Sequence, residues 1–132
     1  MKKKLILFLI LIFISIFIYI PKYVELNNLA IIEGIGIKYG NNTYIVYLKE
    51  MIPIKDDLGI NKKYKYYMVK SSSINTAFKD LKKKTKKKLY YKACSYIVTN
   101  KKISINMINK LSLNTKNIYH TKDVYNKLKR IN

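Results

Sequence analysis

The chain has 132 residues, a length that suits one domain rather than two. Lysine and arginine number 27 against 7 aspartates and glutamates, so the formal charge is +20, while 49% hydrophobic residues exclude a disordered basic tail. A single cysteine, Cys94, and a single histidine, His120, exclude an intrachain disulfide and a multi-cysteine metal site, and they leave little material for histidine-based catalysis.

The N-terminus combines a basic start with an apolar run. Three lysines at 2–4 precede an uncharged segment over residues 5–20, in which Leu5, Phe8, Ile12, Phe17 and Ile20 are typical members. As a helix this segment would extend about 24 Å, and flanking tyrosines and Lys22 could cover the remainder of a ~30 Å hydrocarbon core. A basic region followed by an apolar run is typical of a signal segment. No small residues mark a cleavage site, so we predict that residues 1–20 are a basic n-region and an uncleaved signal-anchor transmembrane helix.

The lysines at 2–4 predict the orientation of this anchor. Positive charges are retained in the cytoplasm, so residues 21–132 are expected to form an extracytoplasmic domain beside membrane lipid. The positive charge of the remaining chain keeps the opposite orientation open, although long domains translocate largely regardless of charge. A buried core helix is the alternative for residues 5–20, but the segment lacks the polar face that such a helix normally has.

Two strands are expected at the start of the exported domain. Residues 29–38 are short and β-branched, residues 39–42 have turn chemistry, and residues 43–50 resemble a second strand. We predict an antiparallel hairpin over 29–50 that ends at Pro53. Residues 54–63 are then expected to form an exposed loop.

A strand, a helix and a further strand are expected next. Residues 64–70 predict a third strand, and residues 89–99 predict a fourth. Between them Ser72 or Ser73 caps a helix whose apolar residues have helical spacing: Ile74, Ala77, Phe78 and Leu81. A strand–helix–strand unit indicates a crossover and one parallel pair.

Two further helices are expected near the C-terminus, over residues 104–113 and 121–131, each with one apolar face. The predicted fold class is therefore α+β: a single N-terminal transmembrane helix followed by a small domain with a mixed β-sheet and about three helices.

Few residues suggest chemistry. Gly34 and Gly36 could begin a nucleotide-binding loop, but Gly40 comes one position too late for GxGxxG and a strand follows instead of a helix. Glycines within a strand more often permit close backbone approach or a bulge. Cys94 could act as a nucleophile only with His120 as its base, and a lone cysteine in a strand is usually a core residue.

The adjacent Asp56 and Asp57 are a weak calcium signal without further ligands. We therefore expect no enzymatic activity, no metal and no cofactor.

A lysine cluster follows the predicted helix, and it consists of Lys82, Lys83, Lys84, Lys86, Lys87 and Lys88. It is either a solvated helix end or a contact site for a polyanion such as phospholipid or an anionic wall polymer. Nucleic acid is not expected, because Arg130 is the only arginine and readers of nucleic acid usually combine arginine with stacking aromatics.

The stretch VELNNLAIIEGIGIK at residues 24–38 resembles the opening of the Ger(x)C family, the C subunits of bacterial spore germinant receptors. The matching positions include Glu25, Leu26, Asn27, Ala30, Gly34 and Gly36. Fainter similarity continues through residues 44–53, 71–81 and 88–98. The resemblance covers the family's N-terminal domain, and it departs from the family pattern at Lys38, where aspartate is usual, and in lacking a lipobox cysteine after the apolar segment.

This resemblance implies a non-catalytic component of a germinant receptor in the spore inner membrane, with integral-membrane A and B subunits as partners. A truncated member of the family is one interpretation of the short chain. Our first hypothesis is a membrane-anchored domain that docks to these partners, through exposed faces of the hairpin at 29–50. The alternative is a membrane-anchored protein that binds polyanions or phospholipid surfaces through Lys82–Lys88.

Overall fold

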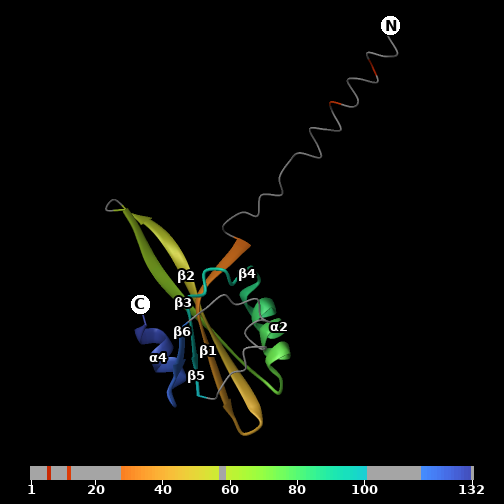
Figure 1. Cartoon of the computed structure of the whole chain (residues 1–132). Helices are drawn as coiled ribbons and strands as arrows, with labels where there is room; N and C mark the ends of the chain where they lie inside the picture. The colour runs from red at the N-terminus through yellow and green to blue at the C-terminus, as the bar shows by residue number, and fades with distance from the viewer. Residues whose placement is uncertain (1–5, 7–11, 13–27, 57–58, 101–116, 132) are drawn as a thin grey trace.

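The computed structural model describes Ile6, Ile12 and residues 28–56, 59–100 and 117–131. These residues form a mixed β-sheet with one helix packed on each face (Figure 1). The strands and helices are β1 (Leu29–Gly40), β2 (Thr43–Asp56), β3 (Gly59–Ser71), α2 (Ile74–Thr85), β4 (Lys88–Tyr90), β5 (Tyr96–Thr99), β6 (Asn117–His120) and α4 (Val124–Arg130).

The predicted hairpin at 29–50 is confirmed. β1 and β2 pair antiparallel from Gly40 and Thr43 inward. The turn between them places Asn41 and Asn42 at φ angles of 49° and 55°. Positive φ at both central residues is the requirement of a type I′ hairpin turn, and asparagine tolerates it better than most residues.

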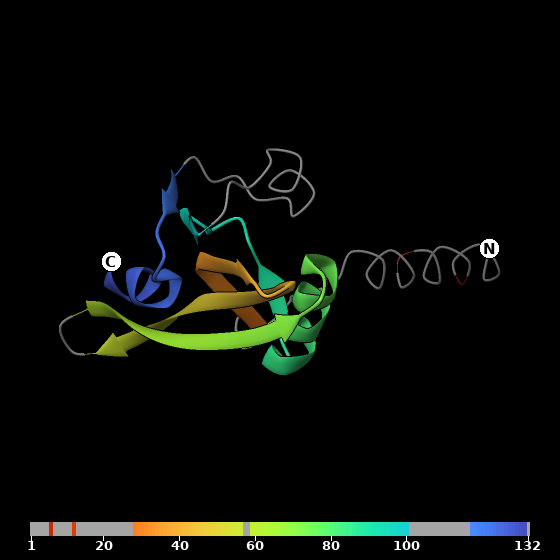
Figure 2. The same cartoon turned by 90° about the horizontal axis from the view of Figure 1, so that it is seen from below.

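The strands β2 and β3 are longer than the sequence predicts. β2 continues past Pro53, which pairs with Lys62, and the pairing runs to Asp56 opposite Gly59. Proline is tolerated here because β1 pairs with β2 only as far as Met51, so beyond it β2 has a neighbour on one side alone. The loop predicted over residues 54–63 is therefore wrong: most of it is the end of a two-stranded ribbon, which Figure 2 shows as a long curved pair.

The chain after α2 pairs with the other edge of β1. β4 runs parallel to residues 29–31 of β1, and β5 runs parallel to residues 34–37. The single strand predicted over residues 89–99 is thus two strands with a turn between them. β6, which the sequence analysis missed, adds a parallel strand outside β5. The sheet order is β3-β2-β1-β5-β6, with β4 beside β1.

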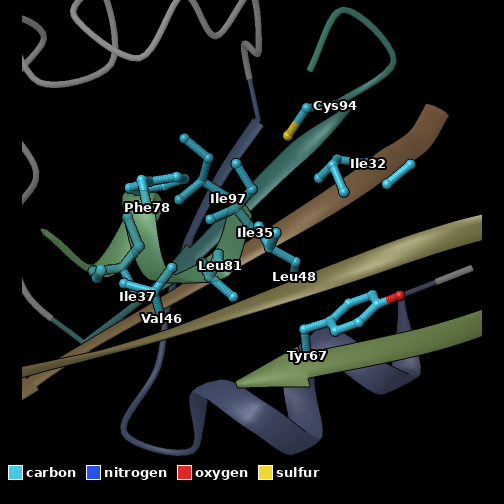
Figure 3. Packing of buried hydrophobic residues seen from close by; sticks show 12 residues of the cluster. Ile32, Ile35, Ile37, Val46, Leu48, Tyr67, Phe78, Leu81, Cys94 and Ile97 are labelled. Atoms are coloured by element: carbon cyan, nitrogen blue, oxygen red, sulfur yellow. The ribbon is translucent and has the colours of Figure 1, made fainter. Parts of the chain in front are cut away.

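The larger core lies between the sheet and α2. Ala77, Phe78 and Leu81 of the helix belong to this core. Figure 3 shows Phe78 and Leu81 beside Ile35 and Ile97 of the sheet. Ser73 is the N-cap of this helix, and its hydroxyl accepts a hydrogen bond of 3.2 Å from the Thr76 amide. The predicted α2 helix and its apolar face are therefore confirmed.

A smaller core lies on the opposite face, under α4. Val124 and Leu128 pack there against Tyr96 and Val98 of β5. Asp123 caps this helix by accepting a hydrogen bond from the Asn126 amide. The helix predicted over 121–131 is thus present but shorter, because it begins only after the Asp123 cap and ends at Arg130.

The predicted fold class needs correction in its helical part. The described residues are mostly strand, and they contain two short helices where a transmembrane helix and about three further helices were expected. None of the helices in the described ranges has the length and apolar character needed to span a bilayer. The helix predicted over 104–113 lies outside the described residues. Residues 117–120 and most of residues 54–63 form strands that the hydrophobic periodicity did not predict, so the described part of the chain contains more strand than expected.

Candidate functional site

The glycines of the Gly34-Ile35-Gly36 stretch make room for side chains on the α4 face. A Cβ atom at Gly34 would lie 2.5 Å from the Tyr96 ring, and one at Gly36 would lie 2.9 Å from a Val124 methyl. Both distances are shorter than van der Waals contact, so only glycine lets the ring and the helix approach β1. Close backbone approach, one of the sequence interpretations, is confirmed.

A β-bulge interrupts β1 at the same place. Ile32 pairs with Glu50 and Gly34 pairs with Lys49, which leaves Glu33 as the extra residue. The bulge keeps Ile32 and Ile35 on the α2 face while Glu33 joins the two glycines on the α4 face. The stretch that resembles the family motif therefore has a structural role. It changes which face of the sheet the successive side chains of β1 point to, and it lets α4 pack closely on β1.

A buried ion pair lies beside the bulge. The Lys49 side chain is fully buried, and its Nζ lies 3.5 Å from Oε2 of Glu33, whose side chain is 15% exposed. The same ammonium donates a hydrogen bond to the Ile131 carbonyl and lies 4.1 Å from the centre of the Tyr64 ring. Lys49 thus joins β1, β2, β3 and the end of α4. Burial raises the pKa of the neighbouring Tyr64 hydroxyl.

A second buried carboxylate lies on the α2 face. Glu50 accepts a hydrogen bond of 2.7 Å from the Tyr67 hydroxyl, and it pairs with the Lys87 ammonium at 2.8 Å. Burial and the hydrogen bond to Glu50 raise the pKa of Tyr67 to about 12. Glu33 likewise has the Lys49 ammonium and, at 3.5 Å, the Tyr64 hydroxyl as partners, which explains how both acids are accommodated inside the sheet.

The lysine cluster is partly structural. Lys87 is engaged by Glu50, and Lys84 donates a hydrogen bond of 2.8 Å to the Met68 carbonyl. The other members of the predicted set are exposed at the end of α2 and the start of β4, and they are Lys82, Lys83, Lys86 and Lys88. The cations lie at the negative end of the helix dipole, as expected.

An apolar hollow of ≈ 180 Å³ lies between the start of β1 and the ribbon. Its walls are mainly the apolar side chains of Leu29, Ile31, Met51, Ile52 and Pro53, with Glu50 and Lys87 at one side. Beyond it the ribbon exposes two isoleucines, since Ile60 is 78% exposed and Ile54 is 41% exposed. Next to these apolar side chains the ribbon also exposes Lys55, Lys62 and Lys63.

The structure does not bring the candidate nucleophile and base together. Cys94 is buried before β5 begins, where its thiol donates to the Tyr96 carbonyl and burial raises its pKa to about 11. His120 is exposed and pairs with Thr99, the last residue of β5. The described ranges also hold no group of acidic, histidine or cysteine residues suited to a metal ion.

Several predicted residues lie outside the described ranges. Of the anchor residues, Leu5, Phe8, Phe17 and Ile20 lie outside, while Ile12 is described as helical and exposed. Of the family-motif residues, Glu25, Leu26 and Asn27 lie outside, while Ala30 is fully buried in the core. Asp57 also lies outside.

Sequence reasoning missed Glu33, Lys49 and Glu50. The available signal was a pair of adjacent charges, Lys49 and Glu50, within a strand that is otherwise apolar on both faces. Successive strand residues point to opposite faces, so such a pair predicts one buried charge on each side of a covered sheet.

Comparison with known proteins decides the family. A family model described as the spore germination protein N-terminal domain matches residues 22–113, a range that includes β1 to β5 and α2. The chain belongs to this family. The resemblance to the Ger(x)C proteins is thereby confirmed, and the chain is a spore germination protein domain. No curated protein and no solved structure matches it.

Proposed function

We propose that this spore germination domain is a non-catalytic, membrane-attached component of a nutrient germinant receptor. It acts by docking to the integral-membrane A and B subunits in the spore inner membrane. The observation that carries the proposal is the family match over residues 22–113. The apolar run at residues 5–20 supports attachment to the membrane, and the three lysines before it favour an extracytoplasmic domain.

The interior charges of the described sheet are engaged with one another. Lys49 and Glu33 contact each other on one face of the sheet, and Glu50 contacts Tyr67 and Lys87 on the other. Groups held by such partners stabilise packing and are not presented to a substrate. Attachment to the membrane raises the effective concentration of the domain beside its partners, so a modest contact area is sufficient.

The outer edge of β3 is the docking surface that the sheet favours. The hairpin at 29–50, named first from the sequence, is a poor candidate, because β1 and the adjoining half of β2 are largely buried between the two helices. In the described part of the chain, β3 is the last strand on its side and pairs with β2 alone. This outer edge makes no strand pairing within the described residues, and such an edge suits an added strand from a partner subunit.

Co-capture tests this function. The tagged full-length chain is co-expressed with the A and B subunits encoded in the same genome, and membranes are extracted with a mild detergent. We expect both subunits to be captured and to remain bound in about 1 M salt, where the Debye length falls to ~3 Å. A variant with Lys82, Lys83, Lys86 and Lys88 changed to glutamine is expected to capture them equally.

The same experiment tests the polyanion alternative, which the four exposed lysines favour. Capture that disappears both in high salt and in the glutamine variant would replace docking with a charge-driven contact. Failure to capture either subunit at low salt would contradict the proposed function.

A further inference from the structure

One end of the sheet holds both the point where the chain enters it and the base of the ribbon. The chain enters the sheet at Leu29, and the pairing of Ile31 with Met51 and of Met51 with Tyr64 places the outgoing half of the ribbon at this same end. Figure 1 shows the start of β1 and the β2–β3 ribbon end on one side, with the β1–β2 turn on the other. The ribbon therefore projects from the end of the sheet that comes first after the apolar run of residues 5–20 in the chain.

The ribbon projects past the rest of the sheet. Five residues of β2 follow Met51, the last one paired with β1, and at the spacing of an antiparallel strand they extend about 17 Å. We call five described residues of this projection the ribbon tip: Ile54, Lys55, Ile60, Lys62 and Lys63. All five side chains are exposed.

The ribbon tip alternates apolar and basic side chains on both faces. Ile54 pairs with Asn61 and Lys55 pairs with Ile60, so the two isoleucines point to opposite faces of the ribbon. Asp56 and Asp57 in the sequence of the tip subtract two charges from its three lysines, which leaves it basic. Long lysine side chains can extend to a polar surface while their stems and the isoleucines remain in an apolar layer.

We propose that the ribbon tip enters the headgroup–acyl boundary of an anionic phospholipid bilayer and forms a second membrane contact beside the N-terminal segment. This inference rests on the membrane attachment in the proposed function. A bilayer fits better than a protein partner, because a protein would need one continuous apolar face whereas lipid surrounds a wedge on both faces. Anionic headgroups also match the flanking lysines.

The apolar hollow supports the same orientation. Its lining residues Leu29, Ile31 and Pro53 lie between the entry of the chain and the ribbon tip. Apolar side chains therefore occur at the base of the ribbon as well as at its tip, on the end of the domain that faces the bilayer in this arrangement.

A single introduced tryptophan tests the proposal, because the chain has no tryptophan of its own. The full-length Ile60→Trp variant is reconstituted with vesicles that contain brominated phosphatidylcholine, with or without phosphatidylglycerol. Full-length Met68→Trp is the matched control, since Met68 is also exposed, on the same face of β3 and eight residues further along it. Thermal unfolding of both variants checks that the fold is retained.

We expect emission from the Ile60→Trp variant to shift to shorter wavelength and to be quenched in the anionic vesicles. Emission from the Met68→Trp variant is expected to stay unshifted and unquenched. Changing Lys62 and Lys63 to glutamate in the Ile60→Trp background should abolish the shift and the quenching.

Two results would overturn the inference. One is a water-exposed, unquenched tryptophan at position 60 in a chain that sediments with the vesicles; the other is equal quenching without phosphatidylglycerol. Failure of the chain to sediment with vesicles would contradict the membrane attachment in the proposed function as well, so the two failures are distinguishable.

Discussion

Two glycines in β1 have a packing role that can be measured one residue at a time. A Cβ at Gly36 would lie 2.9 Å from Val124 and 3.2 Å from Tyr47, whereas one at Gly40 would meet no atom within 4 Å. Position 36 therefore excludes a side chain and position 40 does not. Glycine within the same strand is therefore required for packing at position 36 and not at position 40.

We predict that Gly36→Ala lowers the free energy of unfolding by about 1–3 kcal/mol, the usual cost of overpacking a tight site. Denaturant titration measures it. Gly40→Ala is the control, and its stability should be unchanged within about 0.5 kcal/mol. Because Val124 is the nearest neighbour, Val124→Ala should recover part of the loss in the Gly36→Ala background; strictly additive losses would contradict the clash as the cause.

The buried pair of Lys49 and Glu33 makes a second residue-scale prediction. Lys49→Met leaves the largely buried Glu33 carboxylate without its cation, so unfolding free energy should fall by about 3 kcal/mol. Adding Glu33→Gln to this variant should restore part of the stability, because no unpaired charge remains. A double-mutant cycle with urea unfolding measures the coupling, and a coupling energy near zero would show that the two side chains do not act as a pair.

Cys94 makes a prediction about pH. Burial raises the pKa of its thiol from the ordinary value near 9 to about 11, so the folded state holds its proton more tightly than the unfolded state. Its contribution to stability is complete below pH 9 and is lost as the pH rises through 11. At neutral pH, Cys94→Ala should be less stable than the unchanged chain, because the substitution leaves a cavity. Between pH 9 and pH 11, its free energy of unfolding should fall less per pH unit than that of the unchanged chain.

That difference in slope is expected to approach, at most, about 1.4 kcal/mol per pH unit, the value for one proton. Equal slopes for the two proteins would contradict a protonated thiol in the folded state.

At the scale of elements, the sequence pattern predicted correctly those elements that depend on residues close together in the chain. The spacing of Ala77, Phe78 and Leu81 predicted α2, and these side chains are the buried face of that helix. The two asparagines after β1 predicted the hairpin turn. Local chemistry was sufficient in both cases, because each element uses residues close together in the chain.

Elements that depend on distant partners were predicted poorly. Pro53 is an ordinary stop signal, but the missing neighbour on one side of β2 lets the strand continue. β4 and β5 follow different parts of β1, so a run that resembled one strand became two. Of the candidate site, the sequence predicted the lysine cluster and the glycines, whereas the contacts of Lys49 and Glu50 depend on sheet register and required the structure.

The cap of α2 gives a prediction at this scale. Ser73→Ala removes the acceptor for the Thr76 amide and should lower the free energy of unfolding by about 1 kcal/mol. The sequence left Ser72 and Ser73 as equal candidates, so exposed Ser72→Ala is the natural control and should be close to neutral. Thermal unfolding followed by circular dichroism distinguishes them, and a larger loss at Ser72 would reverse the assignment.

For the whole molecule, family membership and net charge both agree with the proposed membrane contact. A spore germination protein N-terminal domain with a +20 chain and an apolar run near its start suits a place at the surface of an anionic membrane. The sheet directs its ribbon and the lysines at the end of α2 toward the end where the chain enters β1. The proposed receptor role and the proposed lipid contact both depend on which side of the membrane this domain occupies.

Protease accessibility measures most directly which side of the membrane the domain occupies. The full-length chain with a C-terminal epitope tag is expressed in cells that are converted to protoplasts, and a protease is added to the outside. We predict that the tag is digested in intact protoplasts while a cytoplasmic marker survives, and that the chain stays with the membrane pellet. A tag protected until the protoplasts are lysed, or a full-length chain recovered in the supernatant without detergent, would contradict it.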